Sequence, residues 1–491
     1  MSYASLNFGY FVFIVFLLYY IVPINKRWYI LLGGSIIFYL ICDIEHTIFL
    51  FGAIILSYFS AIKIEKSTNE KGRKGLLICT ISVLVGSLVF LKFFDYSMGV
   101  LEYVFQLNGI TVTFPNLGLI LPIGISFYTL QIIGYLIDVY RRQGVSERNI
   151  AKYILFVSFF PIIVQGPISK FEQLQQQLIQ GHHFNYNRMT ASLQIILWGL
   201  LKKVVIADGL AIFVNNVYGS YEQFYGILLY ITMILYSIQL YMDFSGCVDI
   251  CRGVSGLFGI NLIENFTQPY FAISIKDFWH HWHISLSTWL RDYVYIPLGG
   301  NRKDKIRKYV NLMVTFLVSG LWHGAGLNFI VWGGIHGGYQ IIGEISGNIR
   351  SKVKSLLGIQ ENSFSEIFYK NAITFHLVAF AWIFFRSQDL NSACRYIYHM
   401  FSKANMWIVF DGTLTALGLS IGQLIVIIGF ILIVFVVEFF QKYFHIQFRE
   451  RIKQCHVFIY WTIYLVLILS IVCFGIYGVG YNASDFIYGG F

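Results

Sequence analysis

The chain has 491 residues, of which 57% are hydrophobic and only 12% charged, with a formal net charge of +10. Soluble domains carry about 25% charged residues, so this composition excludes an ordinary soluble protein and indicates a polytopic α-helical membrane protein. The Lys and Arg residues lie mostly in short loops between apolar runs, as the positive-inside rule predicts. The positive charge therefore does not indicate a nucleic-acid partner.

Many apolar runs approach or exceed the roughly 18 residues that span a bilayer. Because Gly or Pro interrupts several runs, we predict an all-α polytopic integral membrane protein with roughly 11–13 transmembrane or partial helices around a central cavity. The absence of a polar linker predicts a single membrane domain over residues 1–491. The runs lie near residues 7–23, 28–42, 47–62, 76–94, 118–137, 152–168, 190–215, 224–242, 309–340, 372–386, 421–440 and 456–478.

The charges between the first apolar runs predict the orientation of the chain. Basic residues follow the first run, acidic residues follow the second, and a basic cluster follows the third. This alternation predicts a multi-pass protein with its N-terminus outside the cell. It places the basic loops 63–75, 141–152 and 301–308 in the cytoplasm.

Three charged residues fall within or beside apolar runs in the middle of the chain. Lys202 and Lys203 interrupt the run 190–215, and the simpler interpretation is that both side chains snorkel to an interface. Asp243 lies close to a predicted helix end, where it is either a capping or packing carboxylate or a functional acid. Cys247 and Cys251 are four residues apart, but no neighbouring pattern indicates a zinc site, and we predict no structural disulfide.

The segment 274–294 predicts one continuous amphipathic helix. Ser274 and Asp277 form a capping pattern at its start, and it contains no Gly or Pro. Two functions suit such a helix: it lies in the membrane interface, or it lines a polar cavity with His283 pointing inward. The polar face collects residues at steps of three and four, namely Lys276, His280, His283, Ser287 and Arg291.

A second histidine is predicted at membrane depth. The stretch from Tyr309 to Trp322 carries no charge and gives about 21 Å of helix, which places His323 well inside the membrane and nearer its outer face. Gly320, Gly324 and Gly326 around it allow close approach of another backbone or of a ligand. A lone histidine on an apolar helix is usually structural, whereas the depth and the glycine setting argue for function here.

A series of motifs over roughly residues 120–340 resembles the membrane-bound O-acyltransferase family, and within it the membrane subunit of alginate-type polysaccharide O-acetylation systems. The densest block runs from Phe278 to Ala325 and contains both histidines. The matching segments are LPIGISFYT at 121–129, YLIDVY at 135–140, FP at 160–161, QGPI at 165–168, GLLKKVVIAD at 199–208, MDFSG at 242–246, ENF at 264–266, QPY at 268–270, FW at 278–279, WHISLSTWLRDY at 282–293, YIPLGGNR at 295–302 and GLWHGA at 320–325.

The resemblance implies a bacterial plasma-membrane enzyme that moves an acetyl group from cytoplasmic acetyl-CoA toward an extracytoplasmic polysaccharide or cell-wall hydroxyl. His323 would be the catalytic general base, with His283 as second catalytic residue. Arg291, Asn301 and Arg302 are candidates for holding the phosphates of coenzyme A, although the loop after Asn301 is more simply a topogenic cluster.

The same resemblance implies an extracytoplasmic partner, an SGNH or esterase-like acetyltransferase, and a polysaccharide acceptor. Acetyl-CoA would be a co-substrate, and neither a bound cofactor nor a metal is expected. The alternatives are a D-alanyl transferase of teichoic acid type, which is not expected to carry the YIPLGGNR motif, and a polytopic transporter, against which the lack of internal repeats argues.

Overall fold

The computed structural model describes residues 1–356, 358–361 and 363–477, and every regular element among them is helical. The N-terminal part contains α1 (Leu6–Ile21), α2 (Arg27–Cys42), α3 (Thr47–Lys66), α4 (Glu70–Leu107), α5 (Ile125–Tyr140), α6 (Ile150–Ser158) and α7 (Phe171–Ile179). The middle part contains α8 (Tyr186–Leu200), α9 (Asp208–Gly219), α10 (Ile227–Leu257), α11 (Ile275–His281), α12 (Ile284–Leu290), α13 (Lys305–His323) and α14 (Leu327–Ile345).

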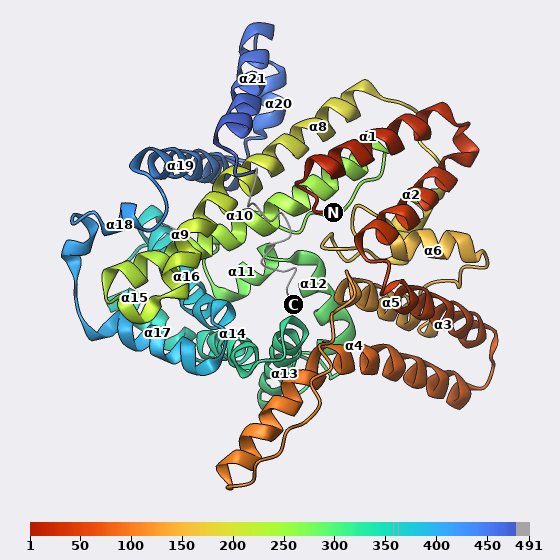
Figure 1. Cartoon of the computed structure of the whole chain (residues 1–491), viewed down its shortest axis with the longest axis horizontal. Helices are drawn as coiled ribbons and strands as arrows, with labels where there is room; N and C mark the ends of the chain where they lie inside the picture. Colours follow the sequence, from red (N-terminus) through yellow and green to blue (C-terminus); the bar gives the residue numbers. More distant parts are fainter. Residues whose placement is uncertain (357, 362, 478–491) are drawn as a thin grey trace.

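The C-terminal part continues with α15 (Gly347–Leu356), α16 (Phe364–Arg386), α17 (Leu390–Ser402), α18 (Thr413–Ala416), α19 (Ile421–Phe444), α20 (Phe448–Lys453) and α21 (Val457–Phe474). Two π-helical segments interrupt the α-helices, η2 (Leu201–Ala207) and η5 (Arg291–Tyr295). Figure 1 places the short helices α11 and α12 near the middle of the view, with longer helices around them.

Six helices in the described part of the chain are long and apolar enough to cross a membrane, namely α3, α4, α10, α16, α19 and α21. The shorter helices α1 and α5 are also apolar. The predicted all-α polytopic membrane fold is therefore confirmed. The exact number of crossings, the central cavity and the single domain stay predictions.

Helix α10 connects the two large hydrophobic clusters of the molecule. Residues of its first half belong to one cluster together with residues of α9, α14 and α16, and residues of its last turns belong to the other together with residues of α1 to α6. Helix α8 lies alongside α10 (Figure 1). At their crossing, a Cβ atom on Gly199 would come within 2.6 Å of the Gly246 carbonyl oxygen, so the two backbones touch. Small residues permit such close packing between membrane helices.

This close packing encloses both lysines of the π-helical segment η2, and the predicted snorkelling is wrong for both. Lys203 is 2% exposed, and its Nζ lies 2.7 Å from Asp208 Oδ1 and 2.8 Å from Asp243 Oδ1. Lys202 Nζ lies 2.5 Å from Asp249 Oδ2. An ammonium group that cannot reach water must be paired inside the protein. Carboxylates on α9 and α10 provide that pairing for both lysines. Asp243 is therefore an ion-pair partner of Lys203.

Two of the three basic loops that were predicted to share one side of the membrane, 63–75 and 141–152, lie together. Arg73 on α4 donates from Nη2 to the Tyr140 carbonyl at the end of α5, over 2.6 Å. Arg148 forms an ion pair with Glu65. The loops 63–75 and 141–152 thus occupy the same side, as the charge alternation requires, while the absolute orientation stays a prediction.

Replacing Lys203 with Met should destabilise the folded protein, because it leaves Asp208 and Asp243 as buried carboxylates without their shared cation. Removing one member of a buried ion pair costs about 3–5 kcal/mol. Thermal unfolding of the purified protein in detergent measures the effect, with Lys74→Met, an exposed lysine on α4, as the control. Equal unfolding temperatures for the two variants would show that the buried pair contributes nothing.

Candidate active site

The predicted continuous helix 274–294 is wrong, because the chain breaks at His283. Helix α11 ends at His281 and α12 begins at Ile284, and His283 between them has φ 44° and ψ 55°. The cause is a tertiary contact with Asn265. The backbone N–H of Ile284 donates to the Asn265 carbonyl and that of Ser285 donates to Asn265 Oδ1, each over 3.0 Å. These bonds replace the helical bonds that local preference alone predicted.

The break separates the residues that were expected to share one polar face. Lys276, His280 and Arg291 are exposed, whereas His283 is only 1% exposed. The segment therefore does not lie in the membrane interface as a single helix. Of the two functions left open for this segment, the interfacial helix is therefore wrong. The inward orientation of His283, which the other function requires, is what the structure shows.

His283 occupies a strained and enclosed position. A left-handed backbone conformation on a residue other than glycine costs about 1–3 kcal/mol and is found mainly at functional sites. The imidazole packs at 4.8 Å from the Phe244 ring and 6.2 Å from the Trp322 ring, measured between ring centroids. Among the described residues, neither Nδ1 nor Nε2 has a hydrogen-bond partner. Buried polar atoms are normally satisfied, so this imidazole is suited to a ligand.

His323 is the last residue of α13 and is also buried, at 3% exposure. Its ring lies 4.7 Å from the ring of Trp322, 5.1 Å from that of Trp332 and 5.2 Å from that of Phe385. Trp322 thus contacts both histidines. The two histidines that the sequence analysis singled out are brought together, although 40 positions separate them in the chain.

The glycines beside His323 serve close helix packing. A Cβ atom on Gly320 would come within 2.3 Å of the Phe329 carbonyl oxygen, and one on Gly324 within 2.1 Å of the Phe329 ring. Helix α14 therefore approaches α13 more closely than any side chain would allow. The expected close approach of another backbone is confirmed at Gly320.

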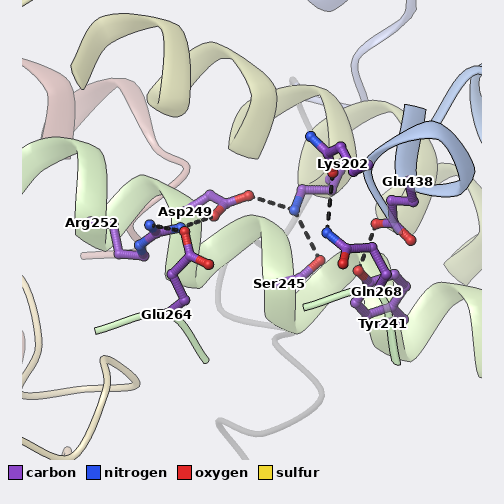
Figure 2. A network of polar contacts seen from close by, with 9 residues as sticks. Lys202, Tyr241, Ser245, Asp249, Arg252, Glu264, Gln268 and Glu438 are labelled. Atoms are coloured by element: carbon purple, nitrogen blue, oxygen red, sulfur yellow. Dashed lines mark hydrogen bonds and ion pairs between the residues drawn. The ribbon is translucent and has the colours of Figure 1, made fainter. Parts of the chain in front are cut away.

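Polar contacts tie both ends of the segment 264–268, which contains Asn265, to neighbouring helices (Figure 2). From η2 and α10 they run through Lys202, Asp249 and Arg252 to Glu264, which accepts from Arg252 Nη2 over 2.6 Å. Glu264 directly precedes Asn265. At the other end of the segment, Gln268 donates to Gln441 Oε1 over 3.2 Å. Both ends of the segment are thus tied to helices, which fixes Asn265 against α12.

The structure does not bring the candidate phosphate-binding residues next to the histidines. Arg291, Asn301 and Arg302 are exposed. Asn301 and Arg302 precede α13, whereas His323 ends it, and a helix of 19 residues is about 28 Å long. Any ligand that touched both places would have to be extended.

Arg291 lies at the far end of α5 from the histidines. Tyr293, two residues after Arg291, donates to Asp138 near the end of α5, while Trp322 Nε1 donates to the Ser126 carbonyl near its start. The 12 residue steps from Ser126 to Asp138 correspond to about 18 Å of helix.

Arg291 itself is engaged by a neighbouring carboxylate. Partial burial acts to raise the pKa of Asp292, but its hydrogen bonds with Arg291 and Lys170 outweigh this effect and hold the pKa below its usual value. Asp292 is therefore charged, and a phosphate would have to compete with it for the Arg291 guanidinium.

Two residues of this region were missed by the sequence analysis. Asn265 appears there only within a motif, without a role. His336 on α14 is fully buried, and Trp279 Nε1 donates to its Nδ1 over 3.3 Å. The rule that an ionisable residue at membrane depth needs an explanation would have found His336. No sequence pattern indicates the contact between Asn265 and α12.

The structure holds neither a disulfide nor a metal-type cluster where it describes the chain. All seven cysteines are free, and Cys247 and Cys251 are buried. No three His, Cys, Asp or Glu side chains of the described residues converge in a way that could hold a metal ion.

Comparisons with known proteins agree with this arrangement. Residues 144–385 match the model of the membrane-bound O-acyltransferase family. The chain is also 34% identical to a probable alginate O-acetylase of Pseudomonas syringae pv. tomato, over 83% of this chain and 76% of that protein. The chain belongs to the membrane-bound O-acyltransferase family. It is accordingly an O-acyltransferase.

Other relatives of this O-acyltransferase carry two further names. A peptidoglycan O-acetyltransferase of Helicobacter pylori is 35% identical, over 75% of this chain and 72% of that protein. A teichoic acid D-alanyltransferase of Bacillus subtilis is 29% identical, over 56% of this chain and 71% of that protein. Family membership argues against the transporter alternative.

Replacing Asn265 with Ala should reduce acyl transfer about 100-fold while the protein still inserts. The change removes the acceptor for Ser285 N–H and so releases the strained conformation of His283, and a misplacement of about 1 Å can cost that factor. Polymer-linked acyl groups in cells that carry each variant at equal membrane abundance measure the effect. Asn187→Ala, on the exposed first turn of α8, is the control, and equal acylation by both variants would argue against this role.

Proposed function

We propose that this O-acyltransferase moves an acetyl group from cytoplasmic acetyl-CoA toward a hydroxyl group of an extracytoplasmic polysaccharide or cell-wall polymer. The names of the relatives support acetyl over D-alanyl transfer, since those named for O-acetylation match with higher identity over more of this chain. The implied setting is the plasma membrane of a bacterium, with the N-terminus outside.

The observation that carries the proposal is the pair of buried imidazoles that both pack against Trp322. An alcohol is a weak nucleophile at neutral pH and needs a base for its proton, whereas a thioester is an activated acyl donor. A second group must stabilise the negative charge that develops on the carbonyl oxygen. Two histidines in a site enclosed by aromatic rings are sufficient for both tasks.

In the proposed reaction, His323 accepts the hydroxyl proton while the alcohol oxygen attacks the thioester carbonyl. His283 donates an N–H to the oxyanion. When the tetrahedral intermediate collapses, the carbon–sulfur bond breaks, and the thiol of coenzyme A leaves with the proton returned from His323. The products are an ester and free coenzyme A. The burial of both rings strengthens each of these interactions because the surroundings have a low dielectric constant.

The donor would enter from the side of the molecule that carries Arg291, Asn301 and Arg302. Its phosphates would lie near these residues and its thioester at the histidines. The separation of about 18 Å along α5 requires the donor to bind in an extended form. The acceptor would approach from the opposite side. The attacking hydroxyl would belong to a partner transferase of the SGNH or esterase-like kind. A polymer hydroxyl would then attack the partner's acetyl ester, so that the acetyl group passes to the polymer and the partner regains its free hydroxyl.

His323→Gln should abolish acetyl transfer, since the amide keeps hydrogen bonding but cannot take the proton. General-base catalysis contributes typically 10²–10⁴-fold, and we expect a loss of at least that size. Polymer-linked acetate in cells at matched membrane abundance is the measurement. His283→Ala should also impair transfer, and His280→Ala, which changes an exposed side chain, is the control. Near-wild-type acetylation by His323→Gln would refute the proposed base.

The orientation can be tested with single cysteines in a variant that lacks the seven native ones. Cysteine at Lys71 or at Asp304 should react with a membrane-impermeant maleimide only after the cells are permeabilised, because both loops are predicted to face the cytoplasm. Cysteine at Glu45, in the loop predicted to lie outside, should react in intact cells. Labelling of the first two positions in intact cells would reverse the proposed orientation.

A further inference from the structure

Lys92 is the only Asp, Glu, Lys, Arg or His residue among residues 75–94 of the long helix α4. A lysine in such an apolar stretch is costly unless its ammonium group finds partners. It finds them on α13, more than 200 positions away in the chain: Nζ donates to the Trp322 carbonyl over 2.6 Å and to the His323 carbonyl over 2.9 Å.

These two carbonyls belong to the last two residues of α13. The last four carbonyls of a helix have no partner within the helix, and their partial negative charge favours a cation. Lys92 supplies the hydrogen-bond donors. The ammonium group therefore closes the end of α13 as a side-chain cap that comes from another helix.

The end of α13 is held on a second side by the indole of Trp322, which donates to the Ser126 carbonyl on α5. Lys92 thus fixes the end of α13 to α4, and Trp322 fixes it to α5. Beyond His323 the backbone becomes extended at Gly324, so no further helical turn holds the histidine in place. These two ties act together with the packing of α14 at Gly320 to hold the imidazole in place.

We propose that Lys92 is a positioning residue for His323. It holds the carbonyl end of α13 so that the imidazole stays beside His283 in the geometry that proton transfer needs. This inference rests on the proposed function, because it assumes that His323 is the base. It assigns a task to an α4 residue that lies outside the motif-dense part of the chain.

The test compares the full-length protein with Lys92→Met and Lys92→Arg in membranes, with radiolabelled acetyl-CoA as the donor. Lys92→Met should lower kcat about 100-fold and leave KM for acetyl-CoA unchanged, because it disturbs the base and not donor binding. Lys92→Arg, whose guanidinium can still reach both carbonyls, should recover most of kcat. Lys74→Met on the same helix is the matched control and should behave as wild type.

A wild-type kcat for Lys92→Met, or a change in KM alone, would overturn the proposal. If Lys92→Met does not accumulate in the membrane, Lys92→Gln takes its place. The Gln side chain keeps an N–H donor but is shorter, so it cannot reach both carbonyls, and a wild-type kcat for it would equally overturn the proposal. His323→Gln is measured in parallel: its activity decides the proposed function, whereas the Lys92 variants decide only the positioning role.

Discussion

The contact between α8 and α10 is the constraint on which the rest of the structure depends. The backbones touch at Gly199 and Gly246, and the π-helical segment that follows α8 is buried over its whole length. The charge of Lys203 must therefore be neutralised inside the protein, and Asp243 on α10 does so. Phe244, the next residue, packs edge-on against His283. A requirement of charge pairing in lipid thus determines where one wall of the candidate site lies.

Two kinds of environment lie at different places along α5. Around His283 and His323 the neighbours are aromatic rings, which exclude water and leave the imidazoles as the main polar groups. Arg291 and Arg302, by contrast, are exposed and lie away from the histidines, where water can screen their charges. This separation suits a reaction between a highly charged donor and a neutral hydroxyl. The phosphates of the donor can stay at the exposed arginines while its acyl group reaches the two histidines.

Much of this arrangement is predictable from the sequence, and the failures share a cause. The apolar runs locate the helices, and the rule about ionisable residues at membrane depth locates His283 and His323. The break at His283 was missed because Asn265 imposes it from another segment. Lys203 was misjudged because the sequence shows that it is charged but does not show that α10 covers it. Local patterns predict helices and candidate residues, whereas the partners of buried groups come from packing between distant segments.

The π-helical segment η2 has a consequence for the number of residues in this region. A π-turn accommodates one residue more than an α-helical turn, and each residue of an α-helix turns the chain by about 100°. Deleting one residue between Gly199 and Asp208 would convert η2 to regular helix and rotate Lys203 away from one of its two carboxylates. A substitution in η2 changes the contacts of one side chain. A change of length shifts every side chain of the segment. A deletion or insertion in this stretch should therefore disturb more contacts than any single substitution there, including Lys203→Met.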